Sequence, residues 1–254
     1  MCIIALAYQQ HPDYPLLLAA NRDEFFARPT AAAHWWQNHN LVAGQDLQAG
    51  GTWLGISRSG RVAALTNFRD PQAMRCNAPS RGKLVSDFLS GDESTEDFVA
   101  RLMPDLAQYN GFNLLLFEAG KLFYVSSVEQ RSEQLPAGLY VVSNHVLDTP
   151  WPKVERLKQG MLQQLAAPQL DAEMLFELLS DRQQPPDSQL PDTGIGLEWE
   201  RRLGSIFVAA PGYGTRASTL LQIHQQCHAE LIERSFDANG VASDTQQFRF
   251  ELNQ

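Results

Sequence analysis

The first 24 residues of the chain read MCIIALAYQQHPDYPLLLAANRDE. Two apolar runs, residues 3–8 and 16–20, are separated by HPDYP at residues 11–15, which is typical of a turn. This pattern predicts a β-hairpin with Cys2 at the start of its first strand and Arg22-Asp23 at the end of its second. Because antiparallel pairing places these two ends side by side, the hairpin brings a thiol, an arginine and a carboxylate to one edge of a sheet.

Cys2 directly follows the initiator Met1. Removal of Met1 would leave Cys2 with a free α-amine, whose pKa of about 8 lets it act as a general base for the thiol, as in N-terminal nucleophiles. A nearby arginine favours the thiolate, and an aspartate orients the arginine or the amine. The alternative is that Cys2 is a core residue and that residues 21–24 are a charged turn. The sequence leaves both interpretations open.

The composition is that of an acidic globular protein. The 254 residues carry a formal net charge of −9, which argues against a nucleic-acid or anionic-membrane partner. The three cysteines, at positions 2, 76 and 227, have neither disulfide nor metal-site spacing, so we expect a reducing, cytoplasmic compartment. We expect no signal peptide and no integral membrane segment, because no apolar run approaches about 18 residues. One domain covering residues 1–254 is predicted.

Hydrophobic periodicity predicts an α+β fold, with strands near both ends of the chain and helical blocks between them. Beyond the first hairpin, strands are predicted at 50–57, 61–67, 112–117, 122–126, 139–143, 206–210, 220–224 and 229–234. Helical patterns occupy residues 84–89, 94–103, 152–165 and 171–179. We expect residues 25–36 to be a connection, residues 181–196 a surface loop and residues 211–216 a glycine-rich turn.

Several polar residues follow directly after predicted strands. Beyond Arg22-Asp23, these are Asn67, Asn144 and Arg216. If the strands assemble into packed sheets, these positions converge around Cys2, although each of them alone also suits an ordinary turn. Gly50-Gly51 ahead of Trp53 suggests that the backbone there passes close to a ligand or to another strand.

Ordered sequence blocks throughout the chain resemble the NRDE family, also called the transport and Golgi organisation protein two family. The blocks occupy residues 1–4, 19–25, 28–29, 50–56, 64–67, 109–114, 143–144, 149–153 and 211–216. The resemblance implies a fold similar to that of the N-terminal-nucleophile hydrolases. That fold is a four-layer αββα sandwich of two antiparallel sheets flanked by helices.

By analogy with cysteine hydrolases of that superfamily, the resemblance also implies a site. Cys2 would be nucleophile and base, with Arg22 and Asp23 tuning it. Asn67 and Asn144 would supply oxyanion-type donors, and Arg216 would anchor the substrate. The implied ligand-binding residues are Asn21, Arg22, Asp23, Glu24, Arg28, Trp53 and Arg216.

The resemblance favours a ligand-handling protein that binds and traffics haem inside the cell. Arg22, Arg28 and Arg216 would meet the propionates, since arginine suits planar anions. Haem would be cargo, with no cofactor required for catalysis and no metal site. The six histidines form no ligand motif, so the choice between histidine and cysteine as iron ligand stays open. One alternative is a cysteine amidohydrolase that uses Cys2 on a linear amide, and another is acyl-CoA or lipid binding.

Overall fold

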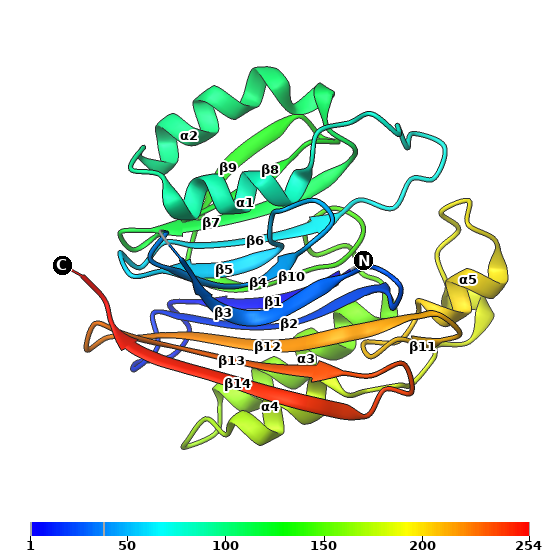
Figure 1. The fold of residues 1–254 in the computed structure, drawn as a ribbon. Helices are drawn as coiled ribbons and strands as arrows, with labels where there is room; N and C mark the ends of the chain where they lie inside the picture. The colour runs from blue at the N-terminus through cyan, green and yellow to red at the C-terminus, as the bar shows by residue number, and fades with distance from the viewer. Residues whose placement is uncertain (1, 38, 254) are drawn as a thin grey trace.

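The computed structural model describes residues 2–37 and 39–253. One antiparallel sheet of seven strands contains segments from both ends of the chain, in the order β10-β1-β2-β12-β13-β14, with β11 paired to β12 (Figure 1). Its strands are β1 (Cys2–Tyr8), β2 (Leu16–Phe25), β10 (Gly138–Val142), β11 (Ala209–Ala210), β12 (Tyr213–His224), β13 (His228–Phe236) and β14 (Ala242–Glu251). We call this sheet A.

The second sheet, sheet B, is a seven-stranded meander whose strands pair in sequence order. Its strands are β3 (Thr30–Trp36), β4 (Leu41–Asp46), β5 (Leu54–Ser57), β6 (Val62–Asn67), β7 (Phe112–Glu118), β8 (Lys121–Ser126) and β9 (Arg131–Leu135). Each neighbouring pair is antiparallel, which needs only short connections.

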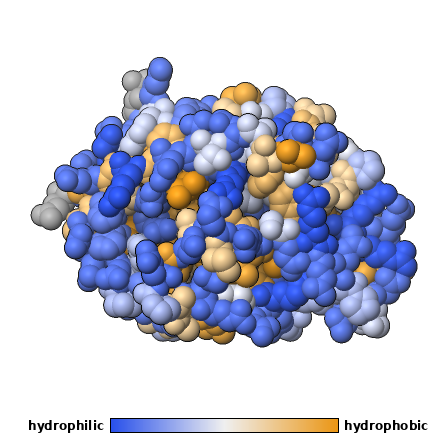
Figure 2. Space-filling view, turned by 90° about the horizontal axis from the view of Figure 1, so that it is seen from below, coloured by the Kyte–Doolittle hydropathy of each residue, from blue (hydrophilic) through white to orange (hydrophobic). Residues whose placement is uncertain are grey.

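Helices cover the outer face of each sheet (Figure 1). Sheet B packs against α1 (Arg81–Ser90), α2 (Thr95–Leu102) and η1 (Met103–Gln108), and sheet A packs against α3 (Pro152–Leu165) and α4 (Ala172–Leu179). The short η2 (Asp187–Gln189) and α5 (Leu197–Arg202) follow α4 in sequence. The predicted α+β architecture with four αββα layers is therefore confirmed. Viewed from the side of α4 and β14, the surface is mostly hydrophilic, with small separate apolar spots (Figure 2).

The alternation of side chains along β1 shows why the first apolar run is continuous. Ile4 and Leu6 face the core between the two sheets, whereas Ile3 and Ala5 face the core under α3 and α4. All seven residues of β1 are buried, because the sheet is covered on both faces. A strand in this position needs apolar residues at every position.

Four sequence-based predictions of secondary structure are wrong. The strand predicted at 50–57 begins only at Leu54. Residues 25–36 are not only a connection, because Thr30–Trp36 forms β3 and pairs with β4. The strand predicted at 206–210 is reduced to Ala209–Ala210; Ile206, Phe207 and Val208 are apolar because they are buried, not because they pair along a sheet. The turn predicted at 211–216 is shorter than expected, since Gly212 takes the positive φ and β12 already begins at Tyr213.

The side chain of Asn21 fixes sheet A to its helical layer. Its amide nitrogen Nδ2 donates hydrogen bonds to the carbonyl oxygens of Leu179 (2.7 Å) and Ile206 (3.0 Å). Its Oδ1 accepts a 2.6 Å bond from the Ser218 hydroxyl. Asn21 is fully buried, so it satisfies carbonyl groups at the end of α4 and before β11 that water does not reach.

We expect Asn21→Ala to lower the free energy of unfolding by roughly 2–3 kcal/mol, because it leaves two buried carbonyl oxygens without a donor. Denaturant unfolding measures this loss. Ser218→Ala is the matched control: it removes one donor from the same amide and is expected to cost only about 1 kcal/mol. Equal stability of Asn21→Ala and the unmodified protein would show that Asn21 does not hold the helical layer in place.

Candidate functional site

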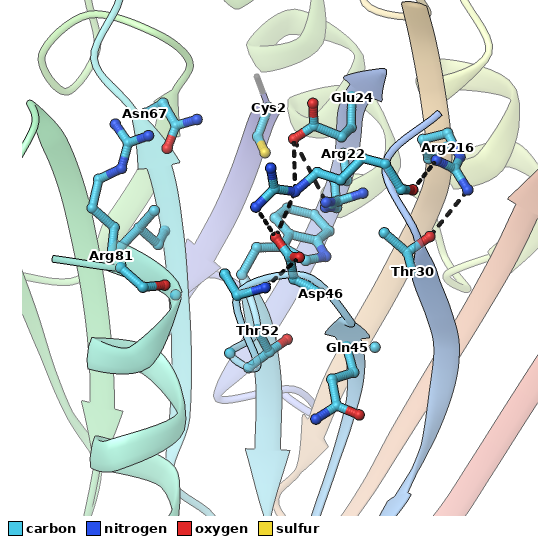
Figure 3. Close-up of a pocket in the computed structure, with 18 of the residues that line it drawn as sticks. Cys2, Arg22, Glu24, Thr30, Gln45, Asp46, Thr52, Asn67, Arg81 and Arg216 are labelled. Carbon is cyan, nitrogen blue, oxygen red and sulfur yellow. Dashed lines mark hydrogen bonds and ion pairs between the residues drawn. The ribbon is translucent and has the colours of Figure 1, made fainter. Parts of the chain in front are cut away.

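A cavity of about 700 Å³ is lined by residues of both sheets and by parts of the segment that connects β6 to α1 (Figure 3). Its volume lies within the usual range of about 300–1,000 Å³ for small-molecule sites. The structure brings together eight of the residues that the sequence analysis assigned to a site: Cys2, Arg22, Asp23, Glu24, Arg28, Trp53, Asn67 and Arg216.

One row of cross-strand neighbours forms the wall of the cavity on sheet A. Cys2 pairs with Arg22, Arg22 pairs with Ala217, and Ala217 pairs with Ser235. All four residues line the cavity, since directly opposed residues on neighbouring strands point to the same side of a sheet. The expected proximity of Cys2 and Arg22 thus follows from the register of the first hairpin. Arg22 and Asp23 lie within β2 and not at its end, because β2 continues to Phe25.

A β-bulge explains how Arg216 reaches the cavity. The register of β12 against β2 shifts between Thr215 and Ala217, so Arg216 is the extra residue. Its guanidinium donates to the carbonyl oxygens of Phe25 (3.0 Å) and Arg28 (3.1 Å), and also to the Thr30 hydroxyl (3.0 Å). Arg216 therefore also secures the connection between the two sheets (Figure 3).

The cavity concentrates positive charge in an acidic protein. Five arginines line it, namely Arg22, Arg28, Arg75, Arg81 and Arg216. Arg28 bonds to Asp46 at 2.7 Å, and Arg22 lies 3.7 Å from Glu24. Among the described residues, by contrast, no ion pair includes Arg75, Arg81 or Arg216, whose guanidinium groups donate hydrogen bonds to carbonyl and hydroxyl oxygens. Glu24 attracts Arg81 and Arg216 from beyond ion-pair distance.

Burial of two of these arginines disfavours their charged form. Burial lowers the pKa of Arg81; the charge of Glu24 opposes this shift, and Arg28 adds a smaller repulsion. Burial also lowers the pKa of Arg216, with a further contribution from Arg22. Like charges held together away from water are stabilised when an anion lies between them. The arginines therefore give the cavity groups that can pair with an anion, beside the four acidic residues that also line it.

Cys2 lies between Asn67 and Arg81 on one side and Arg22 and Glu24 on the other (Figure 3). The residue is only 6% exposed, and burial raises the pKa of the thiol to about 11 although Arg22 acts in the opposite direction. Arg22 favours the thiolate, as expected, but desolvation outweighs this attraction in the chain that carries Met1. At neutral pH the Cys2 thiol keeps its proton.

Asp23 connects the cavity to a buried group of charged residues under sheet A. Its Oδ1 accepts a 2.8 Å bond from the Thr215 hydroxyl, and burial raises the pKa of its carboxyl group against the opposing charges of Lys153 and Arg69. Lys153 donates from Nζ to the Leu203 carbonyl oxygen at 3.0 Å, and burial lowers its pKa to about 7. This amine changes its charge near neutral pH.

An ion pair completes this buried group. Arg69 bonds to Glu200 of α5 at 2.6 Å, and both side chains are less than 5% exposed. The Arg69 guanidinium also lies 4.9 Å from the ring centroid of Trp151. Because Glu200 belongs to α5, this ion pair attaches the segment after α4 to Arg69, close to the site.

Glu233 is a buried carboxyl group in the wall of the cavity, one row deeper than Arg22. Its Oε1 accepts a 2.7 Å bond from the Ala33 backbone, which joins β13 of sheet A to β3 of sheet B. The Thr219 hydroxyl lies 3.4 Å from its Oε2. Burial raises the pKa of Glu233, while Arg22 and His34 oppose the shift. When it is protonated, this group can donate a hydrogen bond to a ligand.

Two of the expected site residues do not line the cavity. Asn21 faces the helical layer, because it neighbours Arg22 along β2 and successive side chains point to opposite faces. Asn144 is fully buried and donates from Nδ2 to the Asn67 carbonyl oxygen at 3.0 Å. This bond supports the end of β6, which carries Asn67, so the Asn144 side chain stabilises the fold and does not face the cavity.

Sequence reasoning missed the lining residues Arg81 and Glu233 and the buried Lys153. Arg81 precedes the apolar pattern of a helix, and Glu233 alternates with apolar residues in a strand, so both resemble surface charges. The burial of Lys153 was not predicted either. A lysine beside Val154 at the start of an amphipathic helix is normally exposed, whereas Lys153 is only 3% exposed.

Within residues 2–37 and 39–253, no group of three or more His, Cys, Asp or Glu side chains is placed to hold a metal ion. The described helices also include none long and apolar enough to cross a membrane.

The sequence profile of the family described as Transport and Golgi organisation 2 matches residues 1–238. The chain is 36% identical to the Transport and Golgi organization protein 2 homolog of Bos taurus, over 99% of this chain and 100% of the relative. It is 34% identical to the Homo sapiens homolog, over 99% of both chains. The Drosophila melanogaster protein is 29% identical over 92% of each chain.

Two solved structures are similar at much lower identity. A Caenorhabditis elegans ortholog of N-acylethanolamine-hydrolyzing acid amidase has 11% identity and a TM-score of 0.47, over 87% of this chain and 92% of that one. A C2A mutant of conjugated bile acid hydrolase from Clostridium perfringens has 10% identity and a TM-score of 0.45, over 99% of this chain and 92% of that one. Similarity at this level does not extend to activity.

We expect Glu233→Gln to remove a pH-dependent loss of stability. Because the folded-state pKa is raised, the free energy of unfolding of the unmodified protein falls as pH rises from the ordinary value near 4.5 to the raised pKa. Glutamine keeps the acceptor for the Ala33 N–H without the charge, so the variant gains stability relative to the unmodified protein across that interval. Denaturant unfolding at a series of pH values measures the difference, with the exposed Glu251→Gln as control. If the free energy of unfolding depended on pH in the same way in Glu233→Gln and Glu251→Gln, the prediction would be contradicted.

Proposed function

The chain belongs to the Transport and Golgi organisation 2 family, and we propose that it is a ligand-handling protein that binds haem in the arginine-lined cavity and passes it between partners. The observation that carries the proposal is the set of arginines without a carboxylate partner, Arg75, Arg81 and Arg216. Haem offers two carboxylates, and arginine binds carboxylates in a planar, bidentate geometry.

The rest of the cavity supports a partly apolar ligand. Trp53, Leu65 and Phe236 line it beside the arginines, so an aromatic macrocycle finds apolar surface as well as charge. The cysteines are free, which suits the reducing cytoplasm that we propose as its compartment. An acyl-CoA is the second ligand of this chemistry, because its phosphates would use the same arginines.

We expect ferric haem titrated into the protein to give a saturable change in its Soret absorption. Arg81→Ala should weaken the affinity by about tenfold to a hundredfold, since a hydrogen bond to a charged group is worth about 1.5–3 kcal/mol. Arg22→Ala and Arg216→Ala should act in the same direction. Arg249→Ala is the matched control, because Arg249 is exposed and does not line the cavity.

Two outcomes would overturn the haem assignment. Absorption changes that do not saturate, or equal affinities of Arg81→Ala and Arg249→Ala, would exclude a specific haem site in the cavity. Coenzyme A added as a competitor separates the two ligands. Saturable coenzyme A binding that depends on Arg81, without saturable haem binding, would keep the anion site and assign it to an acyl carrier.

The second candidate function is a cysteine amidohydrolase. It is favoured by the position of Cys2, whose side chain lines the cavity opposite Arg22 at the start of β1. The raised pKa of the thiol, about 11, weighs against it in the chain that begins with Met1. This candidate therefore requires that removal of Met1 supply the α-amine as a base.

We expect iodoacetamide to alkylate Cys76 and Cys227 before Cys2 in the chain that retains Met1, because both are exposed and Cys2 is a buried thiol. Peptide mapping of a time course measures the order. The same measurement on protein without Met1 tests the hydrolase: Cys2 should become the fastest thiol, and Cys2→Ser should abolish hydrolysis of amide substrates. If Cys2 remains the slowest thiol without Met1, the hydrolase candidate fails.

A further inference from the structure

One wall of the cavity is an irregular segment, residues 70–80, which connects β6 to α1 and which we call the wall segment. It lines the cavity from Met74 onward, with the exception of Asn77. Near its middle, the Arg75 N–H donates to Asn110 Oδ1 and the Asn110 amide donates to the Arg75 carbonyl oxygen, both at 2.9 Å. The part of the segment before this anchor is exposed, so its position depends on what holds its start.

The start of the wall segment is held by Arg69, which directly precedes it. The Arg69 backbone N–H donates to the Asn144 carbonyl oxygen at 2.8 Å, and its guanidinium forms the 2.6 Å ion pair with Glu200 of α5. Glu200 in turn accepts hydrogen bonds from the Thr193 N–H (2.8 Å) and from the Thr193 hydroxyl (2.6 Å). One buried carboxylate therefore connects the wall segment to α5 and to the loop before α5.

The loop before α5 also lies directly against the wall segment. A Cβ atom at Gly194 would lie 3.7 Å from Pro71 Cγ and 3.9 Å from Gln72 Nε2, so the backbone of this loop runs beside the start of the wall segment (Figure 1). Movement of α5 away from sheet A would therefore remove support from one wall of the cavity.

Lys153 holds the end of α5 from behind. Its Nζ donates to the carbonyl oxygen of Leu203, the residue that follows α5, at 3.0 Å. In the described part of the chain this is the one hydrogen bond of Nζ, although an ammonium group carries three N–H bonds. The cavity between Lys153, Arg69 and Glu200 measures only about 10 Å³, which is at the lower limit for a single water molecule. An ammonium group at this position is therefore poorly solvated.

We propose that Lys153, Arg69 and Glu200 form a latch that holds α5 and the wall segment against sheet A, and that protonation of Lys153 releases it. The neutral amine keeps its bond to Leu203 and requires fewer partners than the ammonium group. Release brings the amine into water, where it takes a proton from solvent more readily. The latch goes beyond the proposed function, because it does not depend on which ligand occupies the cavity.

Charged and titratable groups act on the Lys153 amine from the elements around it. Arg69 follows β6 and Glu200 belongs to α5, while Cys2 of β1 and Asp23 of β2 act from sheet A. The pKa of Cys2 is about 11, so this thiol keeps its proton at neutral pH. Burial raises the pKa of Asp23, so ionisation of Asp23 would act on release with the opposite sign to Lys153. A change of Lys153 alone separates the two effects.

The titration of Lys153 sets the pH interval in which the latch responds. Burial lowers the pKa of Lys153 from the ordinary value of 10.5 to about 7. Between these two values the released state binds one proton more than the closed state, so the closed state gains stability as the pH rises. Below about pH 7 both states are protonated, and the released fraction no longer changes.

Hydrogen–deuterium exchange of the full chain between about pH 7 and pH 9 tests the latch without a ligand. Exchange rates of peptides covering residues 193–204 and the wall segment, divided by the intrinsic rates at each pH, report the released fraction. We expect this fraction to rise about tenfold per unit as the pH falls. Lys153→Met should abolish this dependence. Lys158→Met is the matched control, because Lys158 lies on the same helix in a partly exposed ion pair with Asp148, and it should behave as the unmodified chain.

Glu200→Gln tests whether α5 and the wall segment are held by the same group. It removes the charge that pairs with Arg69, so exchange should become at least about tenfold faster in both peptides, as expected for a hydrogen bond between charged groups. Glu198→Gln is the matched control, because Glu198 lies on the same helix in an exposed pair with Arg202. We expect it to leave the wall segment unchanged.

Each other result overturns a stated part of the proposal. Exchange in the unmodified chain that does not change with pH would exclude the role of Lys153, and this result needs no variant to fold. The same pH dependence in Lys153→Met and Lys158→Met would assign the response to another group. Faster exchange of residues 193–204 alone in Glu200→Gln would show that α5 does not hold the wall segment. A failed haem titration would overturn the proposed function and leave these results unchanged.

Discussion

The site depends on the pairing of β2 with strands on both of its sides. β1 and β12 hold β2 in one register, so the alternation of side chains in residues 21–24 is fixed. Arg22 consequently joins Cys2 in the cavity, while Asn21 faces the helices and Asp23, two positions later, meets the buried charges near α3. A slip of one residue would exchange these faces and would bury the arginine among apolar side chains.

Charge is distributed unevenly over this molecule. The chain carries a formal net charge of −9, yet five arginines line one cavity together with four acidic residues. Burial raises the pKa of two of those acids, Asp23 and Glu233, while neighbouring positive charges and hydrogen bonds oppose the shift. The five arginines give this cavity groups that can pair with an anion.

The helical layer under sheet A contributes to the site as well as to stability. Lys153 of α3 and Glu200 of α5 lie in the same buried group as Arg69, which precedes the segment that carries Cys76. Removing one partner of such a group would leave a buried charge without compensation, which is strongly destabilising. This arrangement explains why the long segment after α4 is held against the back of the site although it contains little regular structure.

The sequence by itself determined the first hairpin and the layered α+β architecture, and it indicated several of the residues that line the cavity, because these depend on local patterns. Continuous apolar runs indicate strands that are covered on both faces, and residues such as Cys2 and Arg22 lie next to them in sequence. Family resemblance added the αββα arrangement. The strands β3 and β4 were both missed, because their residues are recognised as strands only through their pairing with each other.

Only the tertiary structure decided the face, the burial and the charge state of the functional residues. Asn21 stands beside the cavity residue Arg22 in sequence and Asn144 directly follows a predicted strand, yet the amides of both hold the protein together. Lys153 and Glu233 look like surface charges until the packing around them is known, and the protonation of Cys2 is set by desolvation that neighbouring residues in sequence do not predict. The burial of these polar and charged side chains is the sum of contacts from distant segments, and for that reason their neighbours in sequence do not encode it.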